Sequence, residues 1–349
     1  MANRGPTFAI LTLFAVAAVI GVSAWWTHRY LSTGRAGKDV NRAAWVASYQ
    51  ERGLEVPSGP RDGFWQDKIP KRVPNVEVGW QETAVDIPGQ ITIDENGWQY
   101  YRSQGEARHK LLILGGSVAF GAYASSEEEA YFTRLGRLLD ADPRTASDIV
   151  VFASIAWKSS QELSAFITRT EALDPDWLIL INGLNDITNG SNARALYSER
   201  TETLDGSPWT LEYHELDYLA RASEYSMNIA KMYTVAQERD VQMLVVLQPS
   251  LSERRERTPI EADLFRRVEE RFGSSQHLRE AHQALRRGLE LIRANLGVQV
   301  LDASQLFDGE PETTFTDMWH FADPGHALLA DALAAELIPL LLAEDAARE

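Results

Sequence analysis

The chain of 349 residues contains no cysteine. Disulfide bonds, thiolate metal sites and a cysteine nucleophile are therefore excluded. Basic side chains are also few beside the acidic ones, 34 against 50, so that the formal net charge is −16 and the isoelectric point is about 5.0. This balance argues against a nucleic-acid partner and against adhesion to anionic lipid through basic residues. Hydrophobic residues make up 44% of the chain, enough for one large folded domain or two smaller ones.

The N-terminal segment carries a long run without charge. This run extends from Gly5 to Thr27 and is about as long as the hydrocarbon core of a bilayer requires. Trp25 and Trp26 close it at positions typical of a membrane interface. We expect residues 1–30 to form a single-pass membrane anchor, with the catalytic part outside the cytoplasm, in the periplasm or at the cell surface. The alternative is a cleaved signal peptide, because residues 22–24 (VSA) would satisfy a small-residue cleavage site.

Residues 31–107 are predicted to form a stalk and an irregular lead-in that packs on the main domain. Prolines recur every few residues between Pro57 and Pro74, which excludes a continuous helix over that stretch. Turn signals at Pro88-Gly89 and Asn96-Gly97 surround an alternating run and predict a small hairpin. The aromatic residues of the lead-in are expected to pack against the main domain; they are Phe64, Trp65 and Trp80.

From residue 108 to residue 345, apolar runs alternate with amphipathic segments. Continuously apolar strands are typical of a sheet covered on both faces, and their alternation with helices indicates parallel pairing. The expected fold is a three-layer α/β/α domain in which catalytic groups collect at the carboxyl ends of the strands. Ser126 and Glu129 predict the start of a helix through a capping box. The five strands are expected at residues 110–114, 148–154, 177–182, 242–248 and 298–302.

Residues suited to nucleophilic catalysis lie at three places in this pattern. Ser117 follows the first predicted strand, Asn185 follows the third, and Asp317 and His320 share one short loop ahead of the last amphipathic helix. A serine needs a base to be nucleophilic at neutral pH, and the base needs an acceptor that fixes its tautomer. His320 and Asp317 are candidates for these two roles. The Asn185 side-chain amide and the Ser117 backbone amide are candidate donors to an oxyanion.

The spacing around the last of these motifs has a second interpretation. Asp317, His320, Asp323 and His326 recur every three residues and could suggest a metal site. Pro324, at the first helical position after Asp323 as N-cap, interrupts a continuous ligand face, so no metal is expected. His326 is expected on the helix surface or in local packing.

The sequence resembles the SGNH (GDSL-like) hydrolases over roughly residues 108–342. Ser117 lies in GGS, residues 183–186 match the pattern GxND, and residues 317–320 match DxxH. The resemblance implies a flavodoxin-like sheet and an enzyme that acts on esters with no metal or organic cofactor. It also implies Ser117 as the nucleophile, His320 as the base, Asp317 as its partner and Asn185 as an oxyanion donor.

Two positions depart from the family's pattern. The first motif usually has an aspartate before the serine, whereas Gly116 stands here, as in a membrane-anchored bacterial branch that this chain resembles. The oxyanion glycine of the second motif corresponds to Ala156. An alanine still donates its backbone N–H if its φ is negative, whereas a positive φ would cost about 1 kcal/mol or more.

The substrate is inferred from the surroundings of these residues. Trp157, Lys158 and Trp319 lie beside candidate catalytic positions and suit a sugar or an acyl chain. The long polar segment after Asp186 is expected to shape the pocket. Together with the anchor, these features favour the removal of O-acyl groups, acetyl above all, from a cell-envelope or exported polysaccharide. The alternatives are an acyltransferase on a glycan, an esterase for lipids or small esters, and an inactive anchored assembly protein.

Overall fold

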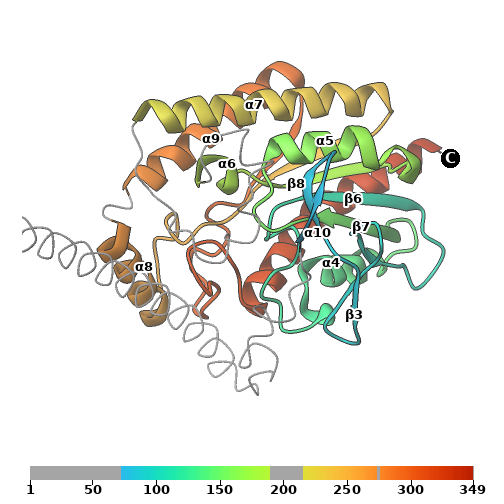
Figure 1. The fold of residues 1–349 in the computed structure, drawn as a ribbon. Coiled ribbons are helices and arrows are strands. Elements are labelled where there is room, and N and C mark those ends of the chain that lie inside the picture. The colour runs from blue at the N-terminus through green and yellow to red at the C-terminus, as the bar shows by residue number, and fades with distance from the viewer. Residues whose placement is uncertain (1–71, 189–214, 273–275, 349) are drawn as a thin grey trace, which may run out of the picture.

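The computed structural model describes residues 72–188, 215–272 and 276–348 (Figure 1). Several predictions fall outside these residues. They concern the anchor at residues 1–30, the packing of Phe64 and Trp65, and most of the polar segment after Asp186.

A six-stranded sheet forms the centre of the fold, in the order β10-β9-β8-β6-β7-β5. Its five parallel strands coincide with the five predicted ones to within one residue at each end, and their order is that of flavodoxin. The sixth strand, β5 (Gln99–Tyr101), pairs antiparallel with β7 at the edge, so the sheet is mostly rather than wholly parallel. The parallel strands are β6 (His109–Gly115), β7 (Ser147–Ala153), β8 (Trp177–Asn182), β9 (Gln242–Leu247) and β10 (Gln299–Asp302).

Helices cover both faces of this sheet, which explains why its inner strands are apolar over most of their length. All six residues of β8 are buried, as are six of the seven in β6 and in β7. The expected α/β/α layering is therefore present, with one group of helices above the sheet and a second group below it in Figure 1. The upper helices are α5 (Ser159–Arg169), α7 (Glu215–Glu238) and α9 (Gln276–Leu296), and the lower ones are α4 (Tyr131–Leu139) and α10 (Asp323–Arg348).

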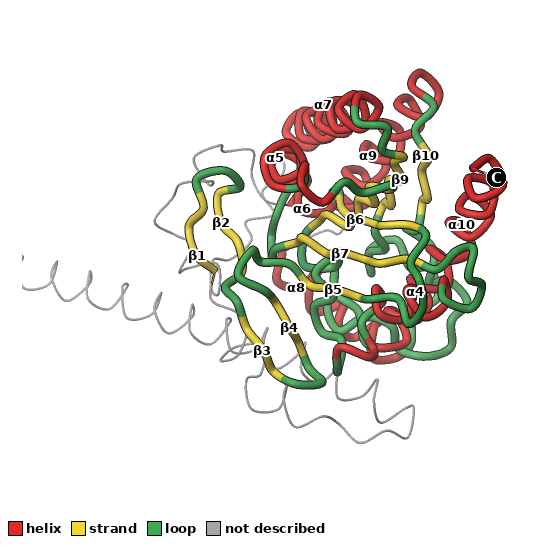
Figure 2. Tube along the Cα trace, turned by 90° about the vertical axis from the view of Figure 1, so that its right-hand side faces the viewer, coloured by secondary structure: helices red, strands yellow, loops and turns green. Residues whose placement is uncertain are grey.

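Two hairpins precede the sheet and lie beside it in Figure 2. The second, β3 (Val85–Ile87) with β4 (Ile91–Ile93), turns at the predicted Pro88-Gly89. The predicted turn at Asn96-Gly97 leads instead into β5, which joins the main sheet. The first hairpin, β1 (Arg72–Asn75) with β2 (Gly79–Glu82), has no counterpart in the sequence prediction.

The helix predicted from Ser126 begins later than expected. The Ser126 hydroxyl accepts the N–H of Glu129 at 3.3 Å, but it caps the short 3-10 helix η1 (Glu127–Glu129). The Glu129 carboxylate contacts Arg134, and α4 starts only at Tyr131. The remaining short helices are η2 (Glu171–Leu173), α6 (Leu184–Thr188) and α8 (Pro259–Phe272).

The last helix, α10, closes the lower layer. Within the described part of the chain it is the helix that is long and apolar enough to span a membrane, over Asp323–Ala347. Leu329, Leu333 and Leu337 on its inner side are fully buried in the core. The core helix of a folded domain can also be this long and this apolar. Since α10 packs against α4, its length and hydropathy are those expected of a core helix.

Candidate active site

Three adjacent strands end at the same edge of the sheet. In the order β8-β6-β7 they pair in parallel and end at Asn182, Gly115 and Ala153. The segments that come after them carry Asn185, Ser117 and Ala156. The strand that follows β6 in the chain, β7, lies on one side of it, and β8, β9 and β10 lie on the other side. This change of direction makes the edge beside β6 the topological switch point where such folds bind ligands.

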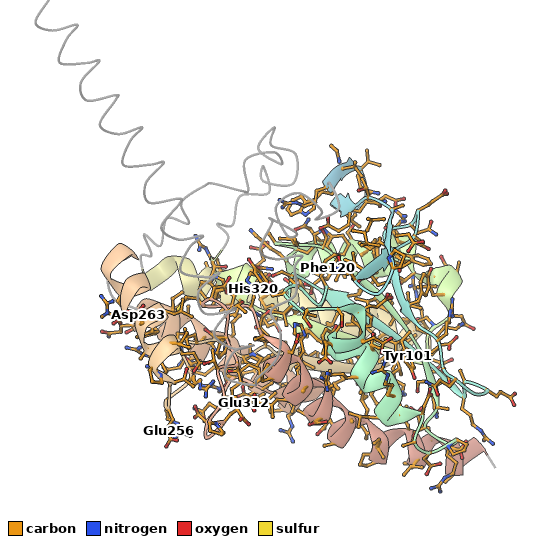
Figure 3. All side chains as sticks on the ribbon, turned by 90° about the horizontal axis from the view of Figure 1, so that it is seen from below. Tyr101, Phe120, Glu256, Asp263, Glu312 and His320 are labelled. Atoms are coloured by element: carbon orange, nitrogen blue, oxygen red, sulfur yellow. The ribbon has the colours of Figure 1, made fainter. Side chains whose placement is uncertain are left out.

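A chain of two hydrogen bonds links the serine to the DxxH loop. The Nε2 atom of His320 lies 2.8 Å from the Ser117 hydroxyl, and its Nδ1 atom lies 2.7 Å from a carboxylate oxygen of Asp317. A carboxylate can only accept, so Nδ1 carries the proton and the neutral ring presents a lone pair at Nε2. The arrangement is therefore set to take the hydroxyl proton of Ser117. His320 is labelled in Figure 3.

The DxxH loop is a tight turn that Asp317 itself holds together. A bridge between Phe315 and Phe321 closes the base of the turn. The Oδ1 atom of Asp317 accepts the backbone N–H groups of Trp319 at 2.7 Å and of His320 at 2.8 Å, and the Oδ2 atom accepts the imidazole. Burial alone would raise the pKa of the Asp317 carboxyl, but the His320 ring and these hydrogen bonds hold that pKa below its ordinary value. Asp317 is thus kept as an anion beside the imidazole.

The candidate oxyanion donors also meet at this edge. One amide hydrogen of Asn185 is donated to the carbonyl of Trp157 at 2.8 Å. A Cβ atom placed on Gly116 would lie 2.2 Å from that amide nitrogen and 3.3 Å from the Trp157 carbonyl, which shows how closely the three segments approach. Among the described residues, the backbone N–H groups of Ser117 and Ala156 donate no hydrogen bond to another backbone group. Both amides remain candidate donors to an oxyanion.

Ala156 has a positive φ of 67°. A positive φ favours glycine, and for an alanine it is less favourable than a negative φ. An alanine held there costs about 1 kcal/mol, and such strain persists only where the surroundings impose it.

Three residues are predicted to face the substrate, and for one of them, Trp157, the structure shows that the prediction is wrong. Trp157 is 0% exposed, and its indole nitrogen donates to the carbonyl of Trp80, so its ring offers no face to a ligand. Lys158 is partly buried, and this burial lowers the pKa of its ammonium while nearby Asp186 raises it. Trp319 is partly exposed and packs against the core beside His320.

Asp323 and His326 turn away from Asp317 and His320. The Asp323 carboxylate accepts the N–H and the hydroxyl of Ser125 at 2.9 and 2.8 Å. It is the first residue of α10 rather than its N-cap. His326 is fully buried, with its Nε2 atom donating to the Ala122 carbonyl at 3.2 Å. This agrees with the local packing expected of it and not with a surface position.

Tyr123 is a site residue that sequence analysis missed. Its ring lies 4.9 Å from the His320 ring, centroid to centroid, at an angle of 34°. Like Ala156, it is a non-glycine residue with a positive φ, 71°. The turn after Ser117 therefore places a second side chain against the imidazole, and a GGS motif gives no indication of it.

The aspartate of the GxND motif lies behind the site. Asp186 is buried and accepts the hydroxyl of Ser159 at 2.5 Å and its backbone N–H at 3.2 Å. These bonds lie at the N-terminus of α5, where a negative charge is favourable. Burial raises the pKa of the Asp186 carboxyl to about 6, against the effect of the Ser159 bonds. Asp186 therefore fixes the start of α5 directly after the Ala156 loop.

The sequence has a counterpart among known protein families. It matches the model of the GDSL-like Lipase/Acylhydrolase family over residues 113–328. No match was found among curated proteins. A catalytic mutant of an acetylxylan esterase from Geobacillus stearothermophilus is similar in structure, with 14% identity, a TM-score of 0.44, and coverage of 67% of this chain and 95% of that one.

Two further solved structures are similar to this chain. A lipase from a goat rumen metagenome has 16% identity and a TM-score of 0.47, covering 65% of this chain and 96% of its own. An α/β hydrolase enzyme from the metagenome of Lake Arreo in Spain has 17% identity and a TM-score of 0.41, covering 66% and 95%.

The family match spans more than half of the 349 residues. It includes all four motif residues brought together at the sheet edge, Ser117, Asn185, Asp317 and His320. The chain therefore belongs to the GDSL-like lipase/acylhydrolase family and is a hydrolase that acts on ester bonds.

Proposed function

We propose that Ser117 is the nucleophile of this hydrolase, with His320 as its general base and Asp317 as the residue that orients the base. The observation that carries the proposal is the continuous pair of hydrogen bonds, 2.8 and 2.7 Å, from Ser117 through His320 to Asp317. His320 takes the hydroxyl proton as the serine oxygen attacks the acyl carbon. The Asp317 anion stabilises the imidazolium that forms.

The oxyanion of the tetrahedral intermediate accepts hydrogen bonds from the backbone N–H groups of Ser117 and Ala156 and from the Asn185 amide. When the intermediate collapses, the bond to the alcohol oxygen breaks and His320 returns its proton to that oxygen. An acyl-serine remains. Water, deprotonated by His320, attacks it in the same way and releases the carboxylic acid and free Ser117.

The substrate in this proposal is an O-acylated polysaccharide of the cell envelope or an exported one, with acetyl as the acyl group. The uncharged run from Gly5 to Thr27 supports a membrane-anchored enzyme that works outside the cytoplasm. Trp319, partly exposed beside His320, supports a sugar ring at the site, because aromatic faces stack on sugars.

Labelling with a fluorophosphonate probe tests the catalytic assignment. The wild-type protein is expected to be labelled at Ser117, and Ser117→Ala and His320→Ala are expected to lose labelling and hydrolysis of p-nitrophenyl acetate. Ser226→Ala is the matched control, because its hydroxyl donates within α7, to the Ala222 carbonyl at 2.8 Å, and Ser226 lies between α7 and α9, away from the site. A Ser117→Ala protein with wild-type turnover would refute the assignment.

Two experiments test the substrate and the location. An acetylated oligosaccharide is expected to release acetate at a rate that does not depend on an added sugar acceptor. Faster transfer of acetyl groups to a de-acetylated oligosaccharide would favour the acyltransferase alternative. The full-length protein is expected to stay in carbonate-washed membranes, whereas a shortened chain beginning at Lys38 is expected in the soluble fraction. Soluble full-length protein with an N-terminus at Trp25 would indicate a cleaved signal peptide.

A further inference from the structure

The hairpin β1–β2 contacts the loop that carries Ala156. We call residues 154–158 the oxyanion loop. The hairpin lies about thirty residues before the family match begins at residue 113, so the family's own motifs do not account for it. It nevertheless bonds to the oxyanion loop through the two side chains Trp80 and Glu82, which are 5% and 1% exposed. The loop is thus held by a part of the chain that lies outside the family match.

Trp80 holds both sides of Ala156. Its indole nitrogen donates to the carbonyl of Ile155 at 3.1 Å, and its carbonyl accepts the indole N–H of Trp157 at 2.8 Å. The residues before and after Ala156 are therefore tied to the same tryptophan. Ala156 itself makes no backbone hydrogen bond within the described part of the chain.

The bond to the Ile155 carbonyl sets the direction of the Ala156 N–H. The two groups belong to one planar trans peptide, in which the oxygen and the hydrogen point in opposite directions. Fixing the oxygen against the Trp80 indole thus turns the N–H away from the hairpin. It also fixes one of the two peptide planes that define the positive φ of Ala156.

Glu82 holds the beginning of the same loop. Its Oε1 atom accepts the Ser154 hydroxyl at 2.8 Å and the Ile155 N–H at 3.2 Å. Burial raises the pKa of the Glu82 carboxyl, and these two bonds act against that effect. A carboxyl group buried this deeply is costly unless it is hydrogen-bonded. The N–H and the carbonyl of Ile155 are consequently both held by side chains of the hairpin.

The second oxyanion donor depends on the same loop. The Asn185 amide is oriented by the carbonyl of Trp157, and the Trp157 indole is bonded to Trp80. The hairpin also reaches α5, where Gln161 donates to the Val78 carbonyl at 2.9 Å. One hairpin therefore supports both the Ala156 N–H and the acceptor that orients Asn185.

We propose that the β1–β2 hairpin is a positioning element of the oxyanion hole. Trp80 and Glu82 keep the oxyanion loop in a conformation that an alanine does not favour by itself, and so aim the Ala156 N–H at the oxyanion. This inference rests on the proposed function of Ser117 and Ala156. Trp80 and Glu82 touch no substrate; they act through the loop.

The substitution Trp80→Phe tests the role of the indole N–H. It keeps an aromatic ring in the core and removes the donor to Ile155. Since removal of an oxyanion donor costs about 10²–10³ in kcat, a misaimed donor is expected to lower kcat by about tenfold to a hundredfold, with KM within about threefold of the wild type. Trp98→Phe is the matched control, because the Trp98 indole nitrogen is buried without an acceptor in the described residues. Wild-type kcat is expected for this control.

A rescue experiment separates positioning from general stability. Glycine takes a positive φ without the cost that alanine has. In an Ala156→Gly background, Trp80→Phe is therefore expected to lower kcat by about threefold or less relative to Ala156→Gly alone. A merely structural Trp80 would give the same loss in both backgrounds, and that result would overturn the proposal.

A second pair of variants covers the case in which Trp80→Phe does not fold. Glu82→Gln keeps an oxygen that accepts both bonds and is expected to retain kcat within about threefold, whereas Glu82→Leu is expected to lose about tenfold or more. Equal activity of Glu82→Leu and the wild type, with activity still dependent on Ser117, would overturn this proposal alone. Activity that survives Ser117→Ala would overturn the proposed function and this inference with it.

Discussion

Asp317 and His320 are joined by two hydrogen bonds within one turn of four residues. The carboxylate accepts the Nδ1 proton of the imidazole at 2.7 Å and also the backbone N–H of His320 at 2.8 Å, and it accepts a third hydrogen bond from the backbone N–H of Trp319. The aspartate therefore fixes the position of the histidine through the backbone and its tautomer through the ring. Removing the charge and removing the side chain should have different consequences.

The first prediction concerns this charge. Asp317→Asn keeps an oxygen for the backbone amides, but its NH₂ group cannot accept the Nδ1 proton, so the ring is expected to take the other tautomer. We expect kcat for p-nitrophenyl acetate to fall by about 10³–10⁴, as in Ser-His-Asp triads generally, with little change in the melting temperature. Asp323→Asn is the matched control, because that carboxylate faces Ser125. Comparable activity of the two variants would contradict the assignment of Asp317.

A second prediction concerns Gly116, the residue that departs from the family's usual aspartate. A Cβ atom at this position would lie 2.2 Å from the Asn185 amide nitrogen. Gly116→Ala is therefore expected to displace that amide and to lower kcat by about 10²-fold, approaching the effect of Asn185→Ala. Gly288→Ala brings a Cβ equally close to the Ser226 hydroxyl, between α9 and α7 and away from the site, and is expected to keep wild-type kcat. Loss of activity in both variants would show that crowding alone is responsible.

Tyr123 gives the third prediction. Its ring packs on the imidazole of His320 with 4.9 Å between centroids, so it limits the rotation of the proposed base. Tyr123→Phe keeps this ring and is expected to retain kcat within about threefold, whereas Tyr123→Ala is expected to lose about tenfold. Measurement of kcat and KM for both variants checks this. If Tyr123→Phe were as poor as Tyr123→Ala, the hydroxyl rather than the ring contact would be important.

The strands and the approximate position of the candidate site can be predicted from the sequence, but the orientation of Trp157 cannot. The five parallel strands are predictable because each contains a run of apolar residues. The proximity of Ser117, Asn185 and the DxxH loop is predictable because parallel strands end at one edge. The neighbours of Trp157 in the sequence suggest that it faces the substrate. Its side chain instead points into the core and bonds to Trp80, because the left-handed turn at Ala156 redirects the chain.

The contacts of Trp80 and Glu82 are not predictable, for a different reason. Trp80 is expected to pack on the main domain, and it does, at 5% exposure. Its partner Ile155 lies 75 residues away along the chain, and Glu82 lies 72 residues from Ser154. No local pattern encodes pairs at such separations. An alanine where the family has glycine is the one sign in the sequence that this loop needs support from elsewhere.

The last prediction concerns acid stability and His326, which lies in the core beneath the site. Burial lowers the pKa of this imidazole from 6.5 to about 4 in the folded protein. Between these two values the unfolded chain binds more protons than the folded one, so the free energy of unfolding falls as the pH falls. From pH 7 to pH 5 this single group is expected to reduce stability by about 2 kcal/mol. The variant His326→Gln retains a donor for the Ala122 carbonyl but has no charge to gain, and should lose correspondingly less stability over that range.

Urea unfolding of both proteins at the two pH values measures the difference directly. His282, whose pKa burial also lowers to about 4, remains in both proteins and cancels in the comparison. Parallel losses in the wild type and the variant would mean that His326 is protonated as readily in the folded protein as in the unfolded one, and would contradict its burial as a neutral ring.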